Sequence, residues 1–194
     1  MNGKCCHDRT AEVYLSAFYC ILREMICGMT NASLTDSISH NFIVQMIPHH
    51  RAAIQMSQNI LKYTSDKELQ RIATGIVTEQ TKSIEDMLAI EKSCGCFTNT
   101  YPKVQAYQRQ MDCIMRTMFA QMQNACATEC LNCDFMWEMI PHHEGAVRMS
   151  ETTLQYAICP ELRPILRAII TSQQKGIKEM QSLLYRLGCR KCCS

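Results

Sequence analysis

The chain has 194 residues, 47% of them hydrophobic, and a net charge of +2 from 20 basic and 18 acidic residues. This balance excludes the basic excess that nucleic-acid binding or polybasic membrane attachment requires, so we expect neither partner. The length suits one domain, assigned to residues 1–194. Sulfur is the unusual feature, because 14 cysteines and 14 methionines accompany six histidines, and soft metal ions prefer these ligands.

The N-terminal sequence suggests neither a signal peptide for secretion nor a membrane-spanning segment. It shows no apolar segment with a small-residue cleavage site, and no uncharged run approaches the ~20 residues that span a bilayer. The expected compartment is therefore the cytoplasm. In that reducing compartment we expect the cysteines to be thiols or metal thiolates rather than a disulfide framework.

The chain contains an internal repeat. Segment 42–50, FIVQMIPHH, matches segment 135–143, FMWEMIPHH, and the same offset aligns most of the chain without a gap. We therefore expect two copies of one unit, 10–96 and 103–189, packed with pseudo-twofold symmetry.

Apolar residues at three- and four-residue spacing predict three helices in the first copy. The first runs near Thr10–Met29 and the second near Asp36–Tyr63. The third begins at a capping box, Ser65 to Glu68, and stops at Gly95.

In the second copy the third helix is expected to begin with Pro160 and to end at Gly188. With no strand-like alternation, the sequence predicts an all-α fold of six helices. The second and third helices of each copy form an antiparallel hairpin. Two such hairpins make a ferritin-like four-helix bundle, and an extra helix precedes each hairpin.

Pro48 and Pro141 lie inside otherwise helical patterns. An interior proline costs ~3 kcal/mol, so the same cost at matching positions indicates a kinked helix that serves a function. The alternative is a helix that starts at the proline.

Histidine pairs follow both prolines, with methionines one turn away. Thioether and imidazole ligands, with few carboxylates, suit Cu(I) or Ag(I). Adjacent residues on a helix point about 100° apart, so one histidine of each pair is expected inside and the other at the rim. Other methionines at helical spacing are interpreted as core. The candidate ligands of the helices are Met46, His49, His50, Met56, Met87, Met139, His142, His143, Met149 and Met180.

The pattern Met-x-x-His-His-x-x-Ala-x-x-Met, followed by a Leu-x-x-x-Ala-x-x-Ile-x-x-x-Gln-x-x-x-Ile-x-x-Met helix, resembles the family called domain of unknown function 305. Copy two departs at Leu166, where the family has alanine. The resemblance covers both hairpins and implies the ferritin-like bundle and copper binding. Characterised relatives are linked to copper tolerance and are generally periplasmic or secreted. The missing leader, the extra first helices and the cysteines point to a cytosolic variant. Copy one carries the pattern as Met46, His49, His50, Ala53 and Met56, then Leu69, Ala73, Ile76, Gln80, Ile84 and Met87.

Two groups of cysteines are further candidate ligands. Cys130 and Cys133 form a C-x-x-C at the start of a predicted helix, with Cys126 one turn earlier and His40 as the copy-one equivalent of Cys133. The terminal group is expected to meet near Cys94 and Cys96, with frayed tails and exposed thiols as the alternative. Its members are Cys5, Cys6, His7, Cys189, Cys192 and Cys193.

The function that the sequence favours is soft-metal binding, with Cu(I) or Ag(I) buffered, stored or detoxified by methionine, histidine and cysteine ligands. No nucleophile–base pair or phosphate loop is present, so we do not expect an enzyme. The alternatives are a structural zinc protein, a di-iron ferritin-like protein, and a helical interaction module without metal. Metal ions are the expected partners, and oligomerisation is left open.

Overall fold

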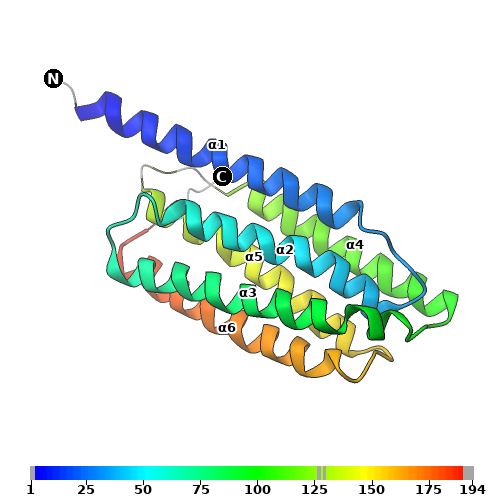
Figure 1. Cartoon of the computed structure of the whole chain (residues 1–194). Coiled ribbons are helices and arrows are strands. Elements are labelled where there is room, and N and C mark those ends of the chain that lie inside the picture. Colours follow the sequence, from blue (N-terminus) through cyan, green and yellow to red (C-terminus); the bar gives the residue numbers. More distant parts are fainter. Residues whose placement is uncertain (1–2, 126–127, 129, 190–194) are drawn as a thin grey trace.

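The computed structural model describes residues 3–125, 128 and 130–189, with side chains from residue 9 onward. Within these residues there are six helices and no strand, which confirms the predicted all-α fold (Figure 1). The helices are α1 Gly3–Thr30, α2 Ile38–Ile60, α3 Lys67–Gly95, α4 Tyr101–Gln123, α5 Leu131–Leu154 and α6 Leu162–Arg186.

The helices form the two predicted hairpins, each preceded by one helix. Hairpins α2–α3 and α5–α6 pack together as a four-helix bundle through contacts of α2 with α5 and of α3 with α6. Helix α1 lies against α2 and α4 lies against α5, on the same outer side of the bundle (Figure 1). The likeness to ferritin in particular stays a prediction.

One hydrophobic core runs through both repeats. Burial of the helix-spaced methionines in α1 and α4 confirms their interpretation as core. Cys20 and Cys113 lie on the same two helices, but both thiols are exposed. The buried stripes are Tyr14, Phe18, Leu22, Met25 and Met29 in α1, and Tyr107, Met111, Met115, Met118 and Met122 in α4.

Both prolines lie inside continuous helices, Pro48 in α2 and Pro141 in α5. The alternative of a helix beginning at the proline is therefore wrong. Helix α1 passes close to the first proline at Gly28, where an added Cβ would lie 2.8 Å from Pro48 Cβ. A side chain at this position would force α1 away from α2.

Three predicted helix ends differ from the structure. Asp66, not Ser65, caps α3, because its carboxylate accepts from two backbone N–H groups at 2.9 Å. Helix α6 begins at Leu162, after a turn that contains Pro160. Gly95 is the last residue of α3, as predicted, whereas α6 ends at Arg186, two residues before the predicted Gly188, which has a left-handed φ of 66°.

Helix α1 is long and apolar, although it carries charged residues. Its segment Arg9–Thr30 has a mean hydropathy of 1.2 and is long enough to cross a membrane. Core helices and signal sequences near an N-terminus share these properties, so the segment is weak evidence for a span. In the structure its stripe from Tyr14 to Met29 is buried in the core.

Candidate metal centre

The two histidine pairs meet where α2 and α5 lie against each other. The rings of His49 and His142 stack with centroids 3.6 Å apart and an interplanar angle of 28°. His50 and His143 flank this stack, with ring centroids 5.8 Å and 5.9 Å from their neighbours. Helices α2 and α5 run antiparallel (Figure 1), so equivalent residues of the two repeats approach each other across a pseudo-twofold axis.

Reciprocal hydrogen bonds fix the tautomer of the central pair. His49 Nε2 donates to the carbonyl of His142 at 3.2 Å, and His142 Nε2 donates to the carbonyl of His49 at 3.0 Å. A carbonyl only accepts, so the proton of each neutral ring lies on Nε2. Each Nδ1 then carries a free lone pair, and neither Nδ1 has a hydrogen-bond partner.

The outer histidines are buried as well. Exposure is 0% for His49, His50 and His142 and 2% for His143, so the expectation of one histidine at the rim is wrong. The second histidine of each pair points away from the central stack but toward a third helix of the bundle. His50 Nε2 lies 3.1 Å from Ser83 Oγ of α3. The ring of His143 lies against Gly176 of α6, where an added Cβ would come within 3.0 Å.

Burial keeps the four imidazoles neutral. Desolvation lowers the pKa of His50 to about 3 and of His142 to about 4. The pKa values of His49 and His143 lie well below the usual range, because of burial first and the neighbouring imidazoles second. A neutral imidazole is the form that binds a metal, so the rings need not lose a proton at neutral pH.

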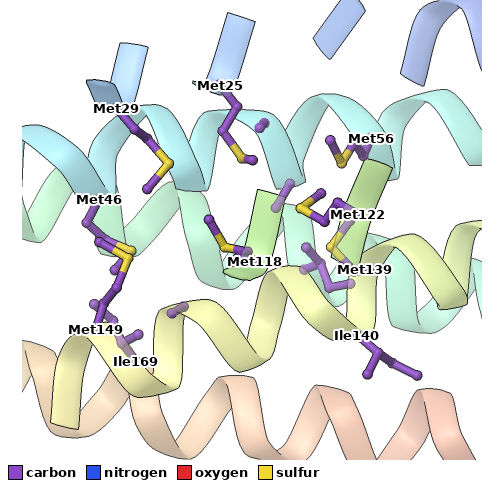
Figure 2. Packing of buried hydrophobic residues seen from close by; sticks show 14 of the residues in the cluster. Met25, Met29, Met46, Met56, Met118, Met122, Met139, Ile140, Met149 and Ile169 are labelled. Atoms are coloured by element: carbon purple, nitrogen blue, oxygen red, sulfur yellow. The ribbon is translucent and has the colours of Figure 1, made fainter. Parts of the chain in front are cut away.

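Buried methionines lie on α2 and α5, the two helices that carry the histidines. Met46, Met139 and Met149 are 0% exposed and Met56 is 2% exposed. In Figure 2 the side chains of Met46 and Met149 point toward one another, while Met56, Met122 and Met139 gather farther along α2. Methionines of opposite repeats thus meet, and Met46 and Met56 lie in different groups.

The facing helices α3 and α6 add methionine and glutamine. Met87 and Met180 are fully buried. Gln80 is 2% exposed, and neither its amide oxygen nor its amide nitrogen has a partner. Gln173, its counterpart, has an unpartnered amide oxygen. Buried polar atoms normally have hydrogen-bond partners. The interior of the bundle therefore contains amide atoms whose hydrogen bonds are unsatisfied.

Carboxylates are scarce in this interior. Among the described residues the buried acids are Asp134 and Glu138, both on α5. Glu138 Oε2 accepts from the Tyr14 hydroxyl at 2.7 Å. Burial raises the pKa of Glu138 well above its usual value. A di-iron centre needs carboxylates from four helices, so the described residues do not provide one.

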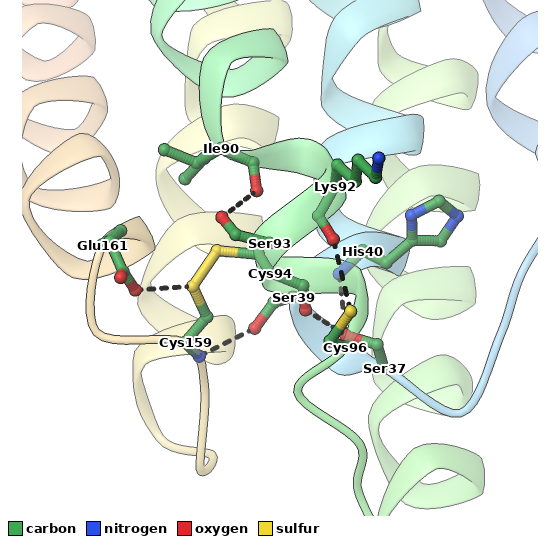
Figure 3. The surroundings of a disulfide bond; sticks show 10 residues. All are labelled: Ser37, Ser39, His40, Ile90, Lys92, Ser93, Cys94, Cys96, Cys159 and Glu161. Carbon is green, nitrogen blue, oxygen red and sulfur yellow. Dashed lines mark hydrogen bonds between the residues drawn. A yellow bond between two sulfur atoms is a disulfide. The ribbon is translucent and has the colours of Figure 1, made fainter.

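Four cysteines form disulfides, which corrects the expectation that the cysteines are thiols or metal thiolates. Cys94 pairs with Cys159 and Cys133 pairs with Cys189. Figure 3 shows the first bond, where Ser39 Oγ accepts from the Cys159 N–H at 2.9 Å. This bond joins the end of α3 to the α5–α6 turn and so links the two hairpins.

The predicted meeting of Cys189 with Cys94 and Cys96 is wrong. Helix α3 ends where α2 begins, because Ser37 Oγ donates to the Cys94 carbonyl at 2.9 Å. Cys189 lies instead at the opposite end of the bundle, bonded to Cys133 in the first turn of α5.

The remaining candidates lie outside the histidine cluster or outside the described part. His40 is half-buried near the start of α2, with Nε2 donating to the Ser33 carbonyl at 3.2 Å. Cys130 is an exposed thiol. The side chains of Cys5, Cys6 and His7 are not among those described, and Cys126, Cys192 and Cys193 lie outside the described residues.

Sequence reasoning missed three partners of the site, namely Ser83, Gly176 and Tyr14. Ser83 and Gly176 occupy equivalent positions of the two repeats. A glycine inside a helical pattern, opposite a serine, was a signal for a close approach at that point. No sequence signal marked the bond between Tyr14 and Glu138, because it joins the first helix of one repeat to the second helix of the other.

The geometry defines a class of protein, a helical bundle whose interior holds neutral histidines among thioethers. More particularly, the chain belongs to the family described as domain of unknown function (DUF305), whose model matches residues 36–184. The fold is similar to that of CopM in its silver-bound form, with 24% identity and a TM-score of 0.58, over 78% of this chain and 98% of that one. It is equally similar to a DUF305 fragment from Deinococcus radiodurans, with 24% identity, a TM-score of 0.58 and coverage of 80% and 98%. No curated protein matches the chain.

Proposed function

We propose that the chain is a non-enzymatic protein that binds Cu(I) or Ag(I) in the histidine cluster, defined as His49, His50, His142 and His143, for copper buffering, storage or detoxification. The observation that carries the proposal is the pair of buried, unpartnered Nδ1 atoms on His49 and His142. A buried lone pair without a donor is costly in an ordinary core. A metal ion would satisfy it.

The surrounding groups favour a soft ion. Thioethers of Met46, Met56, Met139 and Met149 offer polarisable ligands, and Glu138 is engaged with Tyr14. Hard ions such as Mg²⁺ and Ca²⁺ prefer several carboxylate oxygens, and the buried carboxylates among the described residues are those of Asp134 and Glu138 on one helix. The silver-bound CopM structure, with a similar fold, supports the same choice.

The compartment stays a prediction. The sequence favours the cytoplasm, whereas disulfides such as Cys94–Cys159 and Cys133–Cys189 are typical of oxidising surroundings. The experiment therefore uses Ag(I), which needs no reductant and leaves these bonds intact. Free thiols are first alkylated with iodoacetamide under native conditions, so that only histidine and methionine ligands remain.

The test is a titration of the alkylated chain with Ag(I), followed by ¹⁵N NMR of the imidazole rings and by elemental analysis. We expect Nδ1 of His49 and His142 to shift while Nε2 stays protonated, and His142→Gln to weaken binding at least about tenfold. His40→Gln is the matched control and should bind like the parent chain. Unchanged Nδ1 signals, or equal losses in both variants, would refute the proposal.

A further inference from the structure

Three cysteine sulfurs meet at the end of the bundle where α5 begins and α6 ends. The sulfurs of Cys130, Cys133 and Cys189 all lie within 4.8 Å of one another. Cys133 and Cys189 share a disulfide, and Cys130 is a free, exposed thiol. Cys133 lies about 14 Å from His142 along α5, at 1.5 Å per residue, so this sulfur cluster is separate from the histidine cluster.

Local backbone structure builds the sulfur cluster. The segment before α5 is held by Asp134, whose carboxylate accepts from the Thr128 N–H at 2.8 Å and hydroxyl at 2.6 Å. After α6, the left-handed turn at Gly188 reverses the chain, and the Cys189 N–H donates to the Leu184 carbonyl at 3.0 Å. The turn returns Cys189 toward the start of α5.

The equivalent place in repeat one has a different chemistry. Ser37 stands where repeat two has Cys130, and its hydroxyl caps α2 by accepting from the His40 N–H. Cys130 is the N-cap residue of α5 and makes no capping bond with its side chain. Serine is among the preferred N-cap residues, because its hydroxyl satisfies a free N–H of the first turn. The thiol therefore occupies a position where a hydroxyl would stabilise the helix better, and its sulfur remains free to act as a ligand.

We propose that the sulfur cluster is a second, redox-controlled metal site that binds one Cu(I) or Ag(I) ion through three thiolates. A small-molecule dithiol reduces the Cys133–Cys189 bond, taking on an internal disulfide while two electrons and two protons pass to the cysteines. The metal then displaces the thiol protons. Three sulfurs suit a soft monovalent ion, whereas a structural Zn²⁺ site is closed by four ligands.

Access and electrostatics fit this chemistry. Cys189 lines a groove of about 1140 Å³ between α4, α5 and α6, together with Trp137 and Leu184, so reductant and metal reach the bond from solvent. The N-terminal end of the α5 dipole partly offsets the negative charge of a metal–thiolate complex. In the oxidised state the disulfide withholds two of the three ligands.

The experiment compares oxidised and reduced full-length chain carrying Cys94→Ser and Cys159→Ser, which removes the other reducible pair. Reductant is removed anaerobically, and bound Ag(I) is measured by competition with a chelator, followed by X-ray absorption at the metal. We expect reduction to add one Ag(I) per chain with sulfur ligands. Equal capacity in both states, or tighter binding of Zn²⁺ than of Ag(I) by the reduced site, would overturn the proposal.

Cys130→Ser is the decisive variant, because it leaves the disulfide intact. It should weaken the added site at least about tenfold and lower its sulfur coordination from three to two. Cys96→Ser, which removes the exposed repeat-one equivalent of Cys189, is the matched control and should keep the site. Equal effects of the two variants would overturn the proposal. Because the histidine cluster is tested after alkylation of the thiols, either site can fail without the other.

Discussion

The two repeats have the same candidate ligands and different surroundings. Both contribute a histidine pair and flanking methionines to the centre of the bundle. Around them, repeat one has Gln45 and Ser83 where repeat two has Glu138 and Gly176. The repeats therefore match at the centre of the bundle, and they differ in the buried acid and in the residue packed against the outer histidine.

The largest expected effect is the loss of stability at low pH, which comes from the buried histidine pairs that both repeats share. Burial holds the histidine pKa values low, to about 3 for His50 and about 4 for His142, so the folded chain binds fewer protons than the unfolded chain below pH 6.5. Stability is full above pH 6.5 and falls as the pH drops toward 4, by at most about 1.4 kcal/mol per pH unit for each histidine. Urea unfolding of the metal-free chain at pH 7, 6, 5 and 4 measures this slope.

The same measurement can separate the contributions of the two repeats to the pH dependence of stability. Replacing His49 and His50 by glutamine, or His142 and His143, should flatten the slope by similar amounts, because each pair is buried. His40→Gln, which changes a histidine outside the histidine cluster, is the matched control. A slope unchanged in both double variants would show that these rings do not cause the acid sensitivity.

A smaller effect separates the tyrosines at equivalent positions. Tyr14 donates to the buried Glu138 carboxyl at 2.7 Å, whereas the Tyr107 hydroxyl lies 3.2 Å from the Thr153 hydroxyl. Tyr14→Phe strands a buried acid and should cost about 1–3 kcal/mol, while Tyr107→Phe should cost about 1 kcal/mol or less. Thermal unfolding of both variants at pH 7 measures the difference. Equal losses of stability in the two variants would mean that the bond to Glu138 contributes no more than the bond to Thr153.

Much of this fold could be predicted from the sequence. The repeat, the six helices and the proline positions follow from spacing alone, because periodicity and helix breakers act locally. The four histidines were also identified as candidate ligands. Their full burial was not predicted, because it depends on α3 and α6 covering the outer rings of His50 and His143. The disulfides were missed since pairing depends on which helix ends meet, and sequence spacing does not fix that.

The smallest effect concerns access to the histidine cluster, and it tests the divergence most directly. His143 lines a small cavity of about 40 Å³ between α3 and α6, beside Gly75 and Gly176. On the other side of the pseudo-twofold axis, Ser83 covers His50. Metal should therefore reach the cluster from the side of repeat two. Gly176→Ser, which restores the repeat-one residue, should slow Ag(I) loading about tenfold, equal to about 1.4 kcal/mol in the barrier.

Two further variants decide why loading slows. Gly176→Ala fills the cavity without a hydroxyl, so it should slow loading as much as Gly176→Ser if steric closure is the cause. Ser83→Gly opens repeat one and should load at least as fast as the parent chain. Rapid-mixing measurements give the rate, and the final number of bound ions should stay the same in all three. Equal rates would mean that metal does not pass Gly176, and slowing by serine alone would assign control to a hydrogen bond with His143.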